Sequence, residues 1–252
     1  MGAVKLDLSL NHQRELPIGV FDSGVGGLTV LRALQQQLPE EHYLYLGDTA
    51  RLPYGTKSPD TIVRYSLQAA GVLVKRGVKC LVVACNTASS TALEALRERY
   101  PQLPIIGVVQ PGAQAGCEAS ANGRIAVVAT EGTVRGGAYQ RAITAIRPNA
   151  VVVAKACPLF VALAEEGWVS GSIVESIAQR YLGEIFSSPE PPDTLLLGCT
   201  HFPVISLALQ AVLGPKVTIV DSAQTTAAAL SSLLMSLGLM CSPRASTSFE
   251  SV

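Results

Sequence analysis

The chain has 252 residues with 19 Lys plus Arg and 19 Asp plus Glu, so its formal net charge is +0. Hydrophobic residues make up 48% of it and charged residues only 15%, which excludes a disordered chain and fits one large α/β domain or two small ones. No cluster of Lys and Arg is visible, so we expect neither nucleic acid nor an anionic membrane as a partner.

The N-terminal segment carries charges where a signal peptide would need an apolar core, at Lys5, Asp7, Arg14 and Glu15. We therefore expect no export signal. Near the other end, the apolar stretch 227–241 is interrupted by serines and is shorter than the ~20 residues of a bilayer span, which predicts an amphipathic core helix. Six cysteines without a CxxC pair are typical of reduced thiols in a cytoplasmic protein.

Short runs rich in β-branched residues alternate along the chain with helical patterns. Runs this continuously apolar predict strands buried on both faces, and the helical segments between them predict parallel crossovers. The fold class is therefore α/β with mainly parallel sheets. The runs cover residues 18–21, 43–46, 80–84, 105–109, 124–129, 151–154, 194–198 and 217–220.

Helix boundaries are marked at three places. Ser58 followed by Pro59 predicts an N-cap and first turn, and Gly77 predicts the end of that helix. Thr91 and Glu94 have the spacing of a capping box, which predicts a second helix that begins there.

Two pairs of segments suggest an internal repeat. Residues 18–23 resemble residues 125–130, and residues 81–85 resemble residues 195–199. Apolar strands also resemble one another by chance, which is the alternative explanation. A true repeat predicts two related halves that present their strand ends to a shared cleft.

Cys85 and Cys199 each stand where a predicted strand ends, at matched positions of the two halves. Ligands of parallel α/β sheets bind at the carboxyl ends of the strands, so both thiols should face a ligand. A single cysteine is more often an inert core residue, but two at matched positions favour a functional pair. The hydrogen-bonding residues that follow them are Asn86 and Thr87 in one half and Thr200 and His201 in the other.

Two facing thiols are compatible with three kinds of chemistry: a disulfide, a metal site and proton transfer. A disulfide needs Cα atoms within ~7 Å, and a closed zinc site needs four soft ligands where Cys85, Cys199 and His201 offer too few, so we expect no metal. Two thiols on opposite sides of one carbon can exchange protons with it, which is racemisation chemistry. His201 would then polarise Cys199, and Asp22 would assist on the Cys85 side or bind an ammonium group.

Two polar loops follow the first two predicted strands. Residues 22–29 form a glycine-rich turn before a helix, which suits either a nest of N–H groups for a carboxylate or phosphate, or a plain tight turn. The turn departs from the dinucleotide fingerprint at Thr29. In the loop 47–55, Tyr54 either points into the cleft or covers the surface.

The motifs FDSGVGGLTV, LGDTARLPYG, VVACNTASS, CPLFVALAEEG and GCTHFP, taken together, resemble those of the glutamate racemases, a cofactor-independent group in the aspartate/glutamate racemase superfamily. The resemblance implies two pseudo-symmetric α/β domains with the active site between them, one formed by residues 1–104 plus 213–252 and the other by residues 105–212. It also implies interconversion of L-glutamate and D-glutamate for peptidoglycan synthesis, no cofactor, and a homodimer.

By the same resemblance, Cys85 takes the α-proton from D-glutamate and Cys199 from L-glutamate. Asp22, His201 and a glutamate of the CPLF segment assist, and Glu165 fits that position better than Glu166. A related aspartate or hydantoin racemase, and a module that binds an acidic ligand or a protein partner without catalysis, are the alternatives. The implied substrate contacts are Asp22, Ser23, Tyr54, Gly55, Asn86, Thr87, Thr200 and His201.

Overall fold

A computed structural model describes residues 10–241 of the chain. Residues 1–9 and 242–252 lie outside the described residues, and with them most of the N-terminal segment in which no export signal was expected. The eight expected strands are present and form two four-stranded sheets in which every pairing is parallel, so the predicted fold class is confirmed. The strands are β1 (Ile18–Asp22), β2 (Tyr43–Gly47), β3 (Cys80–Val83), β4 (Ile105–Gly107), β5 (Arg124–Ala129), β6 (Val151–Ala156), β7 (Thr194–Gly198) and β8 (Thr218–Asp221).

The two sheets have the same strand order, β2-β1-β3-β4 and β6-β5-β7-β8. The segments that resemble each other in sequence therefore occupy equivalent strands, β1 with β5 and β3 with β7. Phe21 pairs with Val83 in the first sheet, and Ala129 pairs with Gly198 in the second, which brings the ends of the central strands level. The internal repeat is thus structural as well as sequential.

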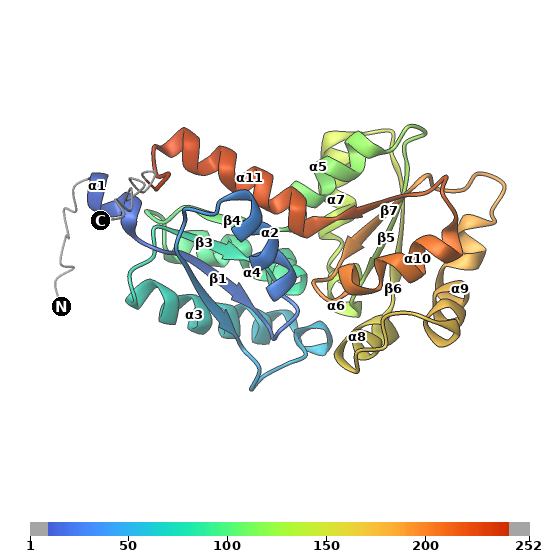
Figure 1. Ribbon diagram of the computed structural model, residues 1–252, viewed down its shortest axis with the longest axis horizontal. Helices are drawn as coiled ribbons and strands as arrows, with labels where there is room; N and C mark the ends of the chain where they lie inside the picture. The colour runs from blue at the N-terminus through green and yellow to red at the C-terminus, as the bar shows by residue number, and fades with distance from the viewer. Residues whose placement is uncertain (1–9, 242–252) are drawn as a thin grey trace, which may run out of the picture.

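Helices cover both faces of each sheet, as continuous apolar strands require (Figure 1). On the first sheet, α2 and α11 pack on one face and α3 and α4 on the other. On the second, α5 and α7 cover one face and α8, α9 and α10 the other. The helices are α1 (Leu10–Glu15), α2 (Leu28–Gln37), α3 (Pro59–Lys75), α4 (Asn86–Arg99), α5 (Val109–Ala119), α6 (Glu131–Gly136), α7 (Ala138–Ile146), α8 (Pro158–Glu165), α9 (Ser172–Phe186), α10 (Ser206–Leu213) and α11 (Ser222–Leu237), with 3-10 turns η1 (Tyr54–Thr56) and η2 (Phe202–Ile205).

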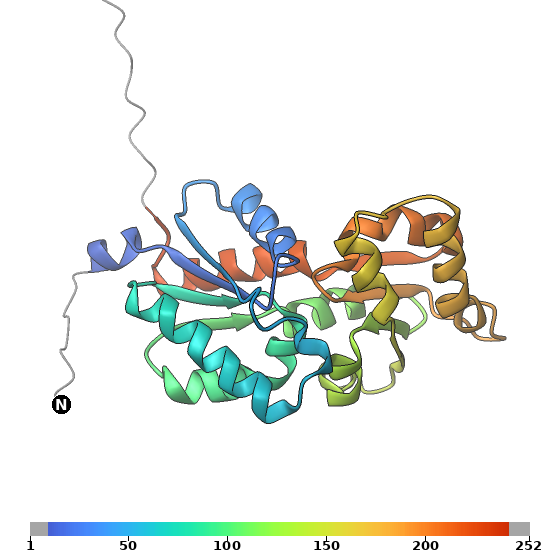
Figure 2. The ribbon, with the colours of Figure 1, turned by 90° about the horizontal axis from the view of Figure 1, so that it is seen from below.

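The two halves exchange their last helices. After β4 the chain leaves the first sheet, and α5 packs on the second; after β8 it leaves the second sheet, and α11 returns over the first (Figures 1 and 2). The predicted boundaries at 104/105 and 212/213 place both crossings one strand too early, because β4 pairs with β3 and β8 pairs with β7. The apolar patterns of strand and helix run on without a linker at either crossing.

The helix boundaries confirm two signals and correct a third. Ser58 accepts a hydrogen bond from the Thr61 N–H at the start of α3, and Gly77, at φ +76°, follows its C-cap residue Arg76. The capping box at Thr91 is wrong, because α4 already begins at Asn86. Its cap is the thiol of Cys85, a residue type that helix-start patterns do not include.

The C-terminal apolar stretch forms α11, whose Ala227, Leu230 and Leu234 are buried against the first sheet while Met235 is exposed. This confirms the predicted amphipathic core helix. Within residues 10–241, no helix combines the length and the apolar character needed to cross a bilayer.

Candidate active site

The carboxyl ends of β1 and β3 meet those of β5 and β7 at a cavity of about 40 Å³ between the two halves. Its lining includes every predicted site residue except Asp22. From the predicted set these are Ser23, Tyr54, Gly55, Cys85, Asn86, Thr87, Glu165, Cys199, Thr200 and His201; Gly24, Leu52, Pro53, Thr130 and Val161 complete the lining.

Cys85 caps α4 and is 4% exposed. Its Sγ accepts a hydrogen bond from the Ala88 N–H at 3.4 Å and donates one to Ser23 Oγ at 3.3 Å. A helix N-terminus favours a thiolate, but burial is the larger effect here. Burial, together with the nearby Asp22 charge, raises the pKa of Cys85 to about 11, so the thiol is protonated at neutral pH.

Asp22 ends β1 and lies fully buried behind the cavity wall. Its Oδ2 accepts hydrogen bonds from the N–H groups of Gly24 and Gly27, both at 3.0 Å. The nest predicted in the loop 22–29 therefore holds the protein's own carboxylate. Thr200 of the second half approaches the other oxygen, Oδ1, at 3.5 Å. Burial raises the pKa of Asp22 above its ordinary value despite these donors.

Cys199 has different surroundings. Its Sγ lies 3.8 Å from Nδ1 of His201, and Nε2 of the same ring lies 3.4 Å from Oε1 of Glu165. Nε2 makes no hydrogen bond within residues 10–241, and the Glu165 carboxylate faces it at this distance. Burial raises the pKa of Cys199 strongly. Glu166 caps the end of α8 and does not line the cavity.

Glycines allow the two halves to meet this closely. A Cβ on Gly26 would lie 2.6 Å from Thr200 Oγ1 and 2.7 Å from the His201 ring. A Cβ on Gly55 would lie 2.7 Å from Thr130. Any side chain at either position would hold the two rows of strand ends apart.

Hydroxyl groups connect the halves beside the cavity. Thr87 Oγ1 lies 2.9 Å from Thr130 Oγ1 and 3.2 Å from Thr133 Oγ1. Thr130 is absent from the predicted site, although the internal repeat aligns it with Ser23. Tyr54, left open between cleft and surface, lines the cavity but is 1% exposed and donates its hydroxyl to Asp48 at 2.6 Å.

The cavity adjoins an apolar outer pocket of about 270 Å³. Six residues line both spaces: Leu52, Pro53, Gly55, Thr130, Val161 and Glu165. The inner space suffices for a few water molecules only. A ligand larger than this space would need the two halves to separate at this mouth.

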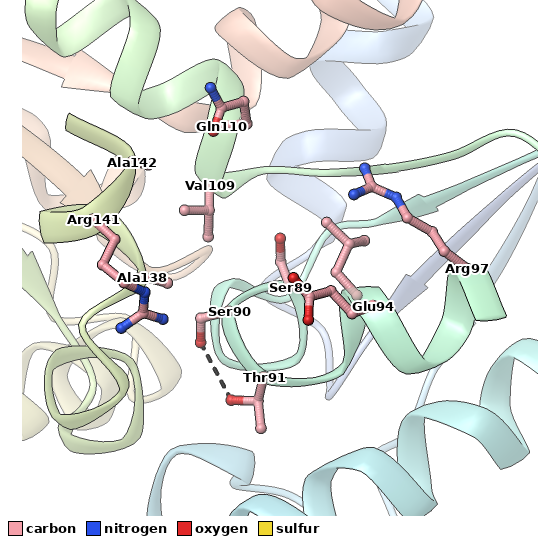
Figure 3. A pocket seen from close by; sticks show the side chains of 11 residues that line it. Ser89, Ser90, Thr91, Glu94, Arg97, Val109, Gln110, Ala138, Arg141 and Ala142 are labelled. Atoms are coloured by element: carbon pink, nitrogen blue, oxygen red, sulfur yellow. Dashed lines mark hydrogen bonds between the residues drawn. The ribbon is translucent and has the colours of Figure 1, made fainter. Parts of the chain in front are cut away.

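A roomier pocket of about 510 Å³ lies between α4, α5 and α7, with Arg97 and Arg141 on opposite walls (Figure 3). None of the predicted site residues lines it. Within residues 10–241, no group of three or more His, Cys, Asp and Glu side chains is placed to hold a metal ion. All six cysteines are free thiols.

Residues 18–230 match the family model described as Asp/Glu/Hydantoin racemase. The chain is 50% identical over 217 residues to the glutamate racemase of Geobacter metallireducens, covering 86% of this chain and 79% of the relative. It superimposes on the glutamate racemase of Francisella tularensis crystallised with D-glutamate (TM-score 0.85, 38% identity, 92% and 85% of the two chains) and on that of Thermus thermophilus crystallised with β-chloro-D-alanine (TM-score 0.82, 45% identity, 91% and 84%). The chain therefore belongs to the Asp/Glu/hydantoin racemase family, as its motifs predicted.

Proposed function

We propose that this protein interconverts L-glutamate and D-glutamate without a cofactor, with Cys85 and Cys199 as its two bases, and so supplies D-glutamate for peptidoglycan. The observation that carries the proposal is that two buried thiols from equivalent strand ends line one cavity from opposite halves. The names of the similar proteins and the D-glutamate bound to the Francisella tularensis enzyme support glutamate as the substrate.

In the proposed reaction, one thiolate takes the α-proton, and the electron pair left on Cα is stabilised by the adjoining carboxylate. The opposite thiol then gives its proton to the other side of the carbon. Each turnover leaves the two sulfurs with exchanged protonation states, so the next turnover in that direction first requires proton exchange with the surroundings. Cys85 serves D-glutamate and Cys199 serves L-glutamate.

The raised pKa values set a condition on this chemistry. A buried thiol becomes a base only when a positive charge enters beside it or a neighbour takes its proton. The α-ammonium group of glutamate brings such a charge. Asp22 on one side and His201 on the other are the neighbours placed to hold a proton.

Neutral donors dominate the remaining lining. Hydroxyls of Ser23, Thr87 and Thr200 and the amide of Asn86 line the cavity, and no Lys or Arg among residues 10–241 does so. Glutamate carboxylates would therefore be bound by several neutral donors instead of one cation. Closure of the mouth would exclude water and strengthen these hydrogen bonds as negative charge develops.

The test is α-proton exchange in D₂O, followed by NMR with purified protein and no added PLP. We expect exchange from both enantiomers with loss of optical rotation. Binding of glutamate without exchange of its α-proton would contradict the catalytic proposal and indicate a binding module. Exchange from aspartate or a hydantoin alone would show that the substrate is not glutamate.

We further propose that the enzyme acts in the cytoplasm as a homodimer. Thiols required as bases need a reducing compartment. Both halves expose large apolar side chains near the contact in which Thr29 Oγ1 donates to the Thr200 carbonyl: Val25, Leu28, Val204 and Leu207 are 43% to 83% exposed. Apolar surface of this kind favours self-association. A particle of monomer mass in sedimentation equilibrium would contradict the dimer.

A further inference from the structure

Asn86 follows Cys85 at the start of α4 and is 2% exposed. Its side-chain oxygen accepts a hydrogen bond from the Tyr139 hydroxyl at 2.6 Å. Its Nδ2 is buried and has no hydrogen-bond partner within residues 10–241. A buried amide with free N–H groups costs free energy unless a ligand completes it. Because Asn86 lines the cavity, its N–H groups can donate to a ligand bound there.

Tyr139 fixes which end of the amide is free. Burial raises the pKa of Tyr139, so its hydroxyl remains a neutral donor. Because the hydroxyl donates to Oδ1, Nδ2 and its hydrogens point away from Tyr139. Removal of the hydroxyl would leave the amide free to rotate or flip.

The ring of Tyr139 is also held by its surroundings. A Cβ on Gly198 would lie 2.9 Å from Tyr139 Cε2, and a Cβ on Gly112 would lie 3.3 Å from Cε1. Gly198 directly precedes Cys199. Tyr139 therefore contacts the residue after one thiol with its hydroxyl and the residue before the other thiol with its ring.

The contact joins the two halves. Asn86 belongs to α4 of the first half, and Tyr139 lies on α7 of the second. Figure 3 shows these helices facing each other, with Ser89 and Ser90 of α4 opposite Ala138 and Arg141 of α7. Ser222, the first residue of α11, also lies within hydrogen-bonding reach of the Tyr139 hydroxyl.

We propose that Tyr139 is a positioning residue for racemisation: it holds the Asn86 amide so that Nδ2 donates to a carboxylate of the substrate when the two halves are closed. The inference rests on the proposed function. Tyr139 then affects how tightly the substrate binds, whereas the two thiols carry out proton transfer.

Tyr139→Phe removes the hydroxyl and keeps the buried ring. We expect KM to rise about tenfold for both enantiomers, the size of one lost substrate hydrogen bond. We expect kcat to change less than about threefold, because the interaction is made equally with bound substrate and transition state. Calorimetric Kd values for D-glutamate should weaken by the same factor as KM, which gives a readout independent of turnover.

Two comparisons separate positioning from a structural role. Tyr43→Phe is the matched control, since the Tyr43 hydroxyl donates to the Leu34 and Leu38 carbonyls away from the cavity. It should lower the melting temperature without changing KM. Asn86→Ala should raise KM on its own, and adding Tyr139→Phe to it should have no further effect on KM.

A Tyr139→Phe variant with unchanged KM and Kd would overturn the inference, as would a KM increase of equal size in the Asn86→Ala background. If Tyr139→Phe fails to fold, unchanged affinity in Asn86→Ala overturns it equally. Wild-type protein that does not exchange the α-proton of glutamate would instead refute the proposed function, so the two failures are distinguishable.

Discussion

Cys85 and Cys199 follow equivalent strands of two sheets with the same order, yet they have different neighbours. Cys85 caps a 14-residue helix and contacts Ser23, near Asp22. Cys199 precedes the short turn η2 and contacts an imidazole that faces Glu165. The repeat thus fixes where the thiols lie, and local residues determine how each one gains and loses its proton.

The difference matters because the two enantiomers have the same free energy, whereas the two thiols that act on them have different neighbours. Enantiomers have equal free energy in water, so kcat/KM must be equal in both directions for the wild type and for every variant. A difference between the residues that assist the two thiols can therefore change only the separate values of kcat and KM and the rate of solvent proton exchange. Variants on the Cys85 side and on the Cys199 side should therefore differ in kcat, KM and solvent exchange.

The largest effect is expected from replacing either thiol. Cys85→Ser and Cys199→Ser should each lower kcat/KM for inversion by about 10³-fold or more, because a serine hydroxyl is a far weaker base. In D₂O, Cys199→Ser should still exchange the α-proton of D-glutamate, and Cys85→Ser that of L-glutamate. A single variant that exchanges both enantiomers equally would mean that one thiol reaches both faces.

A smaller effect is expected on the Cys199 side alone. Glu165→Gln removes the carboxylate that faces His201 and should lower kcat by about tenfold to a hundredfold. Because Cys85 is untouched, exchange from D-glutamate should be less affected than inversion. Glu166→Gln is the matched control and should be neutral. Equal losses in the two glutamine variants would remove Glu165 from the mechanism.

The sequence predicts some features of this fold and site better than others. Continuous apolar runs are sufficient to predict all eight strands, and the cysteine at each strand end is enough to place both thiols at one edge. The exchange of α5 and α11 between halves was not predicted, because a helix pattern shows which face is apolar but not which sheet it covers.

The missed site residues share one property: each acts through a partner in the other half. Thr130 reaches Thr87, and Tyr139 reaches Asn86. Such contacts depend on how the halves close, which no local pattern records. The repeat does align Thr130 with Ser23, so a systematic comparison of the halves could have identified it. The nest of residues 22–29 is a different case, because Asp22 fills it from within the same loop, and the glycine pattern alone does not show which carboxylate the N–H groups bind.

The smallest expected effect is a change in the free energy of unfolding when Asp22, on the Cys85 side, is replaced by asparagine. Asp22→Asn keeps the shape: the amide oxygen can accept from Gly24 and Gly27, and the amide nitrogen can donate to the Thr200 hydroxyl. It replaces a fully buried carboxyl group whose ionisation is disfavoured by burial, so we expect the free energy of unfolding near pH 8 to rise by about 1 kcal/mol while kcat falls. Urea unfolding of the two proteins measures the difference.

The pH dependence shows whether charge is the cause. The folded-state pKa of Asp22 is raised, so its contribution to stability is complete below the unfolded-state pKa and is lost as pH rises through the folded-state pKa. The advantage of Asp22→Asn should therefore be large at pH 8 and shrink as pH falls toward about 4, the ordinary aspartate pKa. A constant advantage would assign the effect to packing, whereas a shrinking one would mean that this half of the site holds a destabilising charge beside its thiol.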